Sequence, residues 1–451
     1  MKSFDPATGE LLEDHRVDTD EDVERKLDHA HHGFDRWKAT DIEQRRKLMR
    51  RAGELLRDRE ESYAELMTHE MGKPIEQARS EVDKCAWAID YFADNAEHFL
   101  EPEPMTSDGS SAYVRFDPMG PILAVMPWNF PFWQVIRFAA PNLMAGNVGL
   151  LKHAENTFGC ARALDNLFSD AGFPEGVFEV LYIDKTRVEP VIADERIRGV
   201  TLTGSTRAGR EVAGAAGRAL KKTVLELGGS DPFIVLHDCD FEHTLEQAVL
   251  ARTQNNGQSC IAAKRFLVED SIYDTFVEEL RVRLESLTVG NPEDKETDIG
   301  PIAREDLRDT LHDQVQRSIE AGARLELGGQ PIDGPGFFYE PTLLAGVEPG
   351  MAAFDEETFG PVAAVTRVED LDHAIRLANR SDFGLGASIW TDEDRGEDAA
   401  ERIDAGHVSV NGIVKSDPRL PFGGIKNSGY GRELSIHGIH EFVNRKTVWV
   451  A

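Results

Sequence analysis

The sequence predicts an α/β protein with two doubly wound domains. Two observations lead to this prediction. Short apolar segments alternate with helical segments from about residue 110 to 235, and a second alternating series continues to about 410. A helical region precedes both series, and glycine- and proline-rich breaks separate the elements. Strands that alternate with helices favour mostly parallel sheets with helices on both faces.

The predicted elements follow in order along the chain. Residues 20–100 have the apolar periodicity of helices, and a breaker-rich segment at 101–109 ends that region. The first alternating series contains predicted strands at 112–116, 122–126, 148–152, 178–183, 199–203 and 223–227, and predicted helices at 156–171 and 207–219. The second series begins with strand 233–236, helix 241–255, strand 265–268 and helix 272–287, and residues 445–450 form an edge strand.

The charge balance limits the classes of partner. The 451 residues include 50 Lys and Arg against 81 Asp and Glu, a net charge of −31. Such a charge argues against binding nucleic acid or an anionic membrane. Only 15 of the basic residues are Lys. This composition favours a salt-adapted (halophilic) protein, because the Debye length is about 3 Å in molar salt and self-repulsion is screened there. An ordinary acidic protein is the alternative.

Cysteine usage and hydropathy predict the compartment. The four cysteines form no CxxC pair, which indicates a reducing environment, and no metal-ligand spacing is present. The N-terminus has no apolar signal segment, and the longest apolar run, 122–133, is interrupted by two prolines and an asparagine. We therefore expect a cytoplasmic protein with neither a membrane segment nor a bound metal.

Two segments are candidates for binding a dinucleotide. Gly204, Ser205 and Gly209 lie at a predicted strand-to-helix turn with GxxxxG spacing, where N–H groups can face a phosphate. The spacing differs from the GxGxxG fingerprint, and a tight turn without a ligand is the alternative. Lys152 and Glu155 follow another strand, where they can bind ribose hydroxyls. A solvated charged loop is the alternative there.

A nucleophilic site is predicted from three distant residues. Cys260 follows a polar turn and has no cysteine or histidine close by in sequence. The Asn129 amide and the Cys260 N–H are candidate donors to an oxyanion, and Glu226 is a candidate base. Each residue also has an ordinary interpretation: an inert buried thiol, a turn asparagine or a solvated glutamate.

Six motifs together resemble the aldehyde dehydrogenase superfamily over nearly the whole chain. They occur in the family's order and at family-like spacing. The motifs are PWNFP at 127–131, TGST with Gly209 at 203–209, ELGG at 226–229, GQSC at 257–260, EETFGP at 356–361 and PFGGIKNSG at 421–429.

The resemblance implies a two-step oxidation of an aldehyde to a carboxylate. The Cys260 thiolate attacks the aldehyde, Asn129 and the Cys260 N–H hold the oxyanion, hydride passes to the nicotinamide, and Glu226 activates water to hydrolyse the thioester. The family pattern also implies cofactor-binding roles for Trp128, Lys152, Glu155, Gly204, Ser205, Gly209, Glu357 and Phe359.

Within the superfamily, residues 126–153 and 254–265 look most like succinate-semialdehyde dehydrogenases. Arg137 matches an arginine that binds the distal carboxylate of the substrate in such enzymes, and a helix-surface ion pair is its alternative. Gln254 stands where some of these enzymes carry a second arginine, so that carboxylate recognition is weaker or shared. The Glu155 charge predicts NAD as cofactor, with NADP possible.

The family fold implies three parts and a homodimer or homotetramer. We expect a dinucleotide-binding domain at 1–103 and 119–228, a catalytic domain at 229–416, and an oligomerisation strand pair at 104–118 and 437–451. Three other functions stay open: a dehydrogenase for another small or aliphatic aldehyde, a coenzyme-A-acylating dehydrogenase and a non-catalytic binding protein. Acylating enzymes generally lack the glutamate that matches Glu226, which argues against the second of these.

Overall fold

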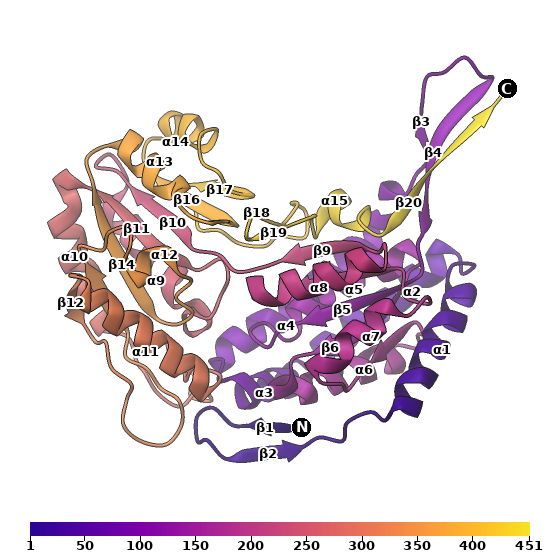
Figure 1. Ribbon diagram of the computed structural model, residues 1–451, viewed down its shortest axis with the longest axis horizontal. Coiled ribbons are helices and arrows are strands. Elements are labelled where there is room, and N and C mark those ends of the chain that lie inside the picture. The colour runs from indigo at the N-terminus through magenta and orange to yellow at the C-terminus, as the bar shows by residue number, and fades with distance from the viewer.

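A computed structural model describes residues 1–451 and contains two α/β lobes and a projecting strand arm (Figure 1). The chain opens with an antiparallel hairpin, β1 (Lys2–Phe4) and β2 (Leu11–Asp14). Four long helices follow: α1 (Asp20–Trp37), α2 (Ile42–Asp58), α3 (Glu60–Met71) and α4 (Ile75–Phe99). The helical region predicted at 20–100 is therefore present.

The first lobe contains a six-stranded sheet in the order β19-β9-β8-β5-β6-β7. Its strands are β5 (Pro121–Met126), β6 (Val148–His153), β7 (Phe178–Val180), β8 (Gly199–Thr203), β9 (Lys222–Glu226) and β19 (Gly429–Tyr430). All neighbours are parallel except β19, which pairs antiparallel with β9. The strand order reverses between β5 and β8, and ligands bind doubly wound sheets at the carboxyl edge of such a switch point. The helical elements of this lobe are α5 (Trp133–Ala145), η1 (Glu155–Thr157), α6 (Phe158–Asp170), η2 (Lys185–Arg187), α7 (Val188–Ala193) and α8 (Thr206–Arg218).

The second lobe contains a seven-stranded sheet in the order β12-β13-β14-β11-β10-β16-β17. Its strands are β10 (Asp231–Val235), β11 (Ala263–Glu269), β12 (Arg324–Leu327), β13 (Thr342–Ala345), β14 (Val362–Val368), β16 (Gly386–Trp390) and β17 (His407–Val410). Only β12 is antiparallel to its neighbour. The helical elements are α9 (Phe241–Thr253), η3 (Gln254–Gly257), α10 (Asp270–Glu285), α11 (Glu305–Glu320), α12 (Ala352–Asp355), α13 (Leu371–Asn379) and α14 (Glu393–Ala400).

Both faces of the second sheet are buried. Ile234 of β10 belongs to one hydrophobic cluster, and its neighbours Phe233 and Val235 belong to another. Successive side chains of a strand point to opposite faces, so each face packs against its own layer of helices. This arrangement explains why the strand sequences are continuously apolar rather than alternating.

A three-stranded sheet projects from the first lobe (Figure 1). It contains β3 (Glu103–Pro104), β4 (Ser111–Pro118) and β20 (Val443–Val450). β20 pairs antiparallel with β4 over its whole length, so the predicted strand pair has a third strand, β3. The remaining short elements are β15 (Phe383–Gly384), β18 (Ile425–Lys426) and α15 (Ser435–Ile439).

Most predicted boundaries are wrong by one to three residues. The strand predicted at 178–183 ends at Val180, and the helix predicted from 156 begins with the 3₁₀ turn η1. The helix predicted at 241–255 ends at Thr253, because Asn255 and Asn256 both have φ of 57° in the left-handed region. None of the helices combines the length and apolar character needed to span a bilayer.

Candidate active site

Cys260 follows a tight turn that precedes β11 at the amino end of the second sheet. Asn255, Asn256 and Gly257 have positive φ, which turns the chain sharply between α9 and Cys260. The Asn255 side chain donates to the backbone oxygens of Asn129 (2.8 Å) and Gln258 (3.0 Å). Left-handed asparagines are strained, and these hydrogen bonds hold the strained conformation.

Asn129 lies beside this turn, as the sequence predicts for an oxyanion site. It follows β5, and its Nδ2 donates to the Gln258 oxygen at 3.1 Å. The same oxygen therefore accepts from Asn129 and from Asn255. A primary amide has a second N–H, which remains available for a ligand. The structure thus brings the Asn129 segment to within two residues of the Cys260 thiol.

The segment that carries Asn129 is held from behind by a buried ion pair. Glu81 of α4 accepts from the N–H groups of Phe132 and Trp133, each at 2.9 Å. Lys73 forms an ion pair with Glu81, and both side chains are almost completely buried. A carboxylate is favourable at a helix N-terminus, so Glu81 fixes the start of α5 immediately after the PWNFP segment.

Burial affects the protonation state of the Cys260 thiol. It raises the pKa of the Cys260 thiol to about 12, and the positive charges of Arg137 and Lys264 oppose this shift. The raised pKa favours the neutral thiol of this half-buried residue, and an added positive charge would favour the thiolate. The other cysteines, Cys85, Cys160 and Cys239, are also free thiols.

Glu226 ends β9, and its carboxylate is 2% exposed without any hydrogen-bond partner. Burial raises its pKa well above the ordinary range, and the nearby Glu433 carboxylate raises it further, whereas Arg137 opposes the shift. Five residues later the chain enters β10 of the other sheet, so Glu226 lies at the crossing between the two lobes. An unpaired, buried carboxyl group can take up and release a proton, as a general base requires.

Arg137 lies inside the protein rather than on a helix surface. It is 2% exposed, its Nε forms an ion pair with Glu433, and its Nη2 donates to Thr203 Oγ1 at 3.3 Å. Its guanidinium also stacks 4.7 Å from the Phe422 ring centroid. Nη1 makes no hydrogen bond within the chain. Gln254, the second predicted substrate residue, is exposed at the end of α9 and makes no side-chain hydrogen bond.

The predicted phosphate-binding turn lies at the carboxyl end of β8. Ser205 caps α8, and its Oγ accepts from the N–H of Ala208 at 3.3 Å. The remaining N–H groups of the first turn are available to an anion. A Cβ on Gly209 would lie 2.5 Å from the Leu227 side chain, so glycine allows α8 to pack closely on the sheet. A Cβ on Gly204 would meet only the Leu202 side chain, at 3.6 Å, so the backbone there is not crowded.

The other predicted cofactor residues lie along the same edge. Lys152 is the penultimate residue of β6, and Glu155 begins η1. Burial lowers the pKa of Lys152, while the carboxylates of Glu155 and Asp184 oppose the shift. The rings of Trp128 and Phe359 meet edge to face with centroids 5.7 Å apart and form an aromatic wall.

Glu357 connects this edge to the nucleophile turn. Its Oε1 accepts from the N–H of Gly229 at 3.0 Å and lies 3.9 Å from Lys264 Nζ. Burial raises the pKa of Glu357, and the Lys264 charge opposes that shift. An aromatic wall, a helix N-terminus and a lysine with paired carboxylates are the groups that a dinucleotide requires, so this edge fits such a cofactor.

Sequence analysis missed three residues of this site: Lys264, Glu433 and Asn255. The sequence contains a signal for Lys264, because a lysine stands near the start of an apolar strand, four residues after Cys260. Glu433 carried none, since its contact with Arg137 joins segments far apart in sequence.

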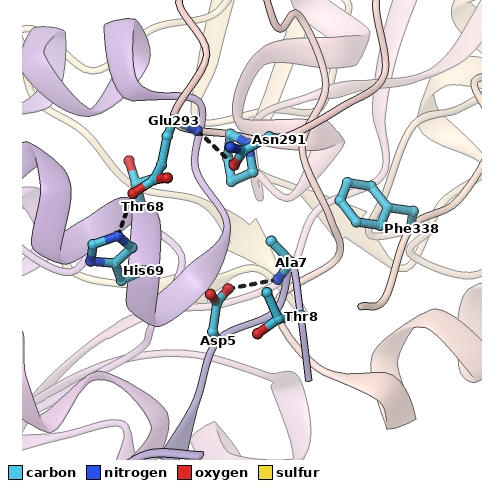
Figure 2. Close-up of a pocket in the computed structure, with 9 residues that line it drawn as sticks. Asp5, Ala7, Thr8, Thr68, His69, Asn291, Glu293 and Phe338 are labelled. Atoms are coloured by element: carbon cyan, nitrogen blue, oxygen red, sulfur yellow. Dashed lines mark hydrogen bonds and ion pairs between the residues drawn. The ribbon is translucent and has the colours of Figure 1, made fainter. Parts of the chain in front are cut away.

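A separate pocket of about 370 Å³ contains none of the predicted site residues (Figure 2). This pocket is lined by the β1–β2 hairpin, the end of α3 and residues 291–293. Within it, His69 Nε2 lies 2.6 Å from Glu293 Oε1. No group of three or more His, Cys, Asp or Glu side chains is arranged to hold a metal ion.

Comparison with known proteins identifies the class. The model of the aldehyde dehydrogenase family matches residues 1–448, and the chain belongs to this family.

Relatives within the family are more specific. The chain is 51% identical over 452 residues to a probable succinate-semialdehyde dehydrogenase [NADP(+)] of Synechocystis sp., with both chains covered completely. It is 50% identical to the succinate semialdehyde dehydrogenase [NAD(P)+] of Escherichia coli strain K12, covering 99% of this chain and 97% of that one. The crystal structure of succinic semialdehyde dehydrogenase from Streptococcus pyogenes with NADP+ superposes with a TM-score of 0.98 at 39% identity, covering 100% of this chain and 99% of that one. The predicted fold class is therefore confirmed.

Proposed function

We propose that this protein is an NAD(P)-dependent aldehyde dehydrogenase that oxidises succinic semialdehyde to succinate. The observation that carries the proposal is the junction at the Gln258 oxygen, where Asn129 and the Cys260 turn meet. This junction supports a site in which an amide donor and a backbone N–H act on a substrate bound at one thiol, as nucleophilic attack on a carbonyl carbon requires. Two relatives, 51% and 50% identical to this chain over nearly its full length, are named for the same activity.

The first step forms a bond between Cys260 Sγ and the aldehyde carbon. The carbonyl oxygen becomes an oxyanion, which accepts hydrogen bonds from Asn129 Nδ2 and the Cys260 N–H. The thiol must lose its proton to solvent before this attack, and its raised pKa makes that ionisation unfavourable in the free protein. A bound nicotinamide would supply the acceptor for the aldehyde hydrogen as hydride, and Cys260 would then hold the acyl group as a thioester.

The second step is hydrolysis of that thioester. Water attacks the thioester carbon and gives its proton to Glu226, and the Cys260 thiolate leaves with the electrons of the C–S bond. Glu226 is suited to this transfer because its carboxylate has no hydrogen-bond partner that would compete for the proton. The product is a carboxylic acid, which ionises to succinate.

Arg137 supports succinic semialdehyde as the substrate. Glu433 and Thr203 orient the guanidinium from one side and leave Nη1 without a partner. The Arg137 charge also lowers the pKa of the Cys260 thiol, against the effect of burial. A carboxylate at the far end of a short aldehyde can then accept from Nη1. Because Glu433 neutralises the Arg137 charge, recognition depends on hydrogen bonding more than on net attraction.

The test compares aldehydes with and without a distal carboxylate. The Arg137→Ala variant should lose about 2–5 kcal/mol of transition-state binding toward succinic semialdehyde, measured from kcat/KM. Butanal, which has a similar chain length and no carboxylate, is the matched control and should change much less. An unchanged preference between the two aldehydes would rule out the carboxylate-binding role, and no activity on either in the wild type would rule out the enzyme class.

We propose NAD as the preferred cofactor because Glu155 and Asp184 both face Lys152 and would repel a 2′-phosphate. Relatives are named for NADP or NAD(P), so the choice needs measurement. The wild type should show the higher kcat/KM with NAD, and Glu155→Gln should raise kcat/KM for NADP about tenfold through loss of one carboxylate charge. A wild-type preference for NADP would contradict the proposal.

The remaining predictions concern organisation. We propose the dinucleotide-binding domain at 1–103 and 119–228 and the catalytic domain at 229–416, each supported by its own sheet. A homodimer or homotetramer through the projecting sheet is supported by the exposed Trp449 and Val450 on β20. Four free thiols support a cytoplasmic location, and the charge of −31 supports salt adaptation. Sedimentation and thermal unfolding in dilute and molar KCl test assembly and salt dependence together.

A further inference from the structure

We propose that Lys264 is a positioning residue that holds the peptide between Ser259 and Cys260 so that its N–H faces the substrate oxyanion. The proposal rests on the function proposed above and adds a residue that no motif of the family assigned. In this role Lys264 stabilises the oxyanion site through the backbone and does not contact the substrate.

Lys264 is completely buried, and its ammonium group is directed into the nucleophile turn. Nζ donates to the backbone oxygens of Ser259 (2.9 Å), Cys260 (2.8 Å) and Ala262 (3.3 Å). An ammonium group has three donors, and these three carbonyl groups use all of them. A buried ammonium group is costly unless its donors are hydrogen-bonded in this way.

The position of Lys264 matters because of peptide geometry. The Ser259 oxygen and the Cys260 N–H belong to one peptide unit, and no peptide bond in the chain is cis. In a planar trans peptide the C=O and N–H point in opposite directions. Anchoring the Ser259 oxygen on Lys264 therefore directs the Cys260 N–H away from the lysine. The charged donor also polarises the amide, which strengthens its N–H as a donor.

The surrounding charges maintain the ammonium form. Glu357 Oε1 lies 3.9 Å from Nζ, and Asp231 also faces the lysine. Burial lowers the pKa of Lys264, the two carboxylates oppose that shift, and Arg252 adds to it. Lys264 in turn opposes the raised pKa of the Cys260 thiol. One side chain thus links the oxyanion donor, the thiol and the Glu357 carboxylate.

The adjacent residue shows what a purely structural cation on this strand does. Arg265 is also buried, but it donates to the backbone oxygens of Ser230, Leu377 and Ala378, which lie outside the nucleophile turn. Arg265 therefore joins β11 to neighbouring elements of the second lobe. All three acceptors of Lys264 lie within five residues of it, in the turn itself.

The test removes the ammonium group and follows the thiol and the reaction separately. Lys264→Met keeps the aliphatic stem, Lys264→Gln keeps a neutral donor, and Lys264→Arg keeps the charge. The matched control is Lys221→Met, because Lys221 is a half-buried lysine that donates to the Ile192 oxygen at 2.5 Å in the first lobe. The measurements are the alkylation rate of Cys260 by iodoacetamide from pH 7 to 10, kcat and KM for succinic semialdehyde, and the thermal midpoint.

The expected result for Lys264→Met is a kcat about 10²-fold lower, as for a misplaced oxyanion donor, with a smaller change in KM. Its alkylation rate at each pH should fall about tenfold, equivalent to one unit of thiol pKa. Lys264→Arg should recover part of both losses, and Lys221→Met should lose neither.

A folded Lys264→Met protein with wild-type kcat and alkylation rate would overturn the proposal. If Lys264→Met does not fold, Lys264→Gln decides: reduced alkylation and kcat support the proposal, and wild-type values overturn it. Equal losses in Lys221→Met would also overturn it, since they would show a general effect of removing a buried lysine. Failure of the proposed function is distinguishable, because the wild type would then oxidise no aldehyde while the alkylation comparison still tests Lys264.

Discussion

The turn around Cys260 and the carboxylates around Glu226 are both buried, yet they are built in opposite ways. In the turn, Asn255 and Lys264 supply hydrogen bonds to five backbone oxygens and hold the chain in a strained path. Around Glu226 neither carboxylate oxygen has a partner, and Glu433 adds a second negative charge nearby. The backbone oxygens of the turn thus have hydrogen-bond donors, whereas the carboxylate oxygens of Glu226 have none.

The proposed function gives a reason for this difference. An oxyanion site works when its donors are fixed before the reaction, so rigidity at the turn lowers the barrier. A base must change its protonation state, and fixed hydrogen-bond donors would hold it ionised and weakly basic. The unsatisfied carboxyl group therefore has a functional reason, although it destabilises the ionised folded state.

The sharpest way to separate the two regions is Glu226→Gln. Without the base, thioester hydrolysis should slow and kcat should fall about 10³-fold. The turn is untouched, so the first turnover should still release one equivalent of NADH in a rapid burst, which stopped-flow absorbance measures. Loss of the burst together with kcat would show that Glu226 also serves the first step. Retention of wild-type kcat would contradict its role as base.

Asn255 tests the opposite region, with a somewhat smaller effect. Asn255→Ala removes two hydrogen bonds and places alanine at a φ of 57°, so kcat should fall about 10²-fold and the burst should slow with it. Asn255→Gly tolerates the backbone and lacks only the amide, which separates strain from hydrogen bonding.

The matched control for these variants is Asn379→Ala, because Asn379 donates to the Arg402 oxygen at 2.8 Å on an exposed part of the second lobe. It should keep wild-type burst kinetics. If both Asn255 variants retained the burst rate, the turn would not need this support.

The smallest expected effect is on the pH dependence of the free energy of unfolding. The folded pKa of Glu226 lies well above 4.5, so the unfolded state binds fewer protons between 4.5 and the folded value. Wild-type stability therefore falls as pH rises through that window, by about 1.4 kcal/mol for each unit of the shift. Glu226→Gln lacks this loss. Its advantage in free energy of unfolding should be absent below pH 4.5 and grow toward pH 8, as urea titrations at several pH values can show. An advantage that shrinks with rising pH would contradict the raised pKa.

Much of the fold was predictable from the sequence because its signals are local. Alternating strands and helices between 110 and 410 were correctly expected, and strand 199–203 has the predicted limits. The end of α9 was not predictable, because helical periodicity continues to residue 255 while the chain turns two residues earlier. That turn is stabilised by contacts with Asn129, a segment far away in sequence.

By itself the sequence predicted which side chains carry chemistry: the Cys260 thiol, a glutamate near two glycines, and an asparagine between prolines. Their roles as a site remain the proposal made above. Only the tertiary structure decided their states. Arg137 is paired with Glu433, Glu226 has no partner, and Lys264 supports the Cys260 backbone. These properties depend on burial and on charges brought together from distant segments, and local sequence patterns do not encode either.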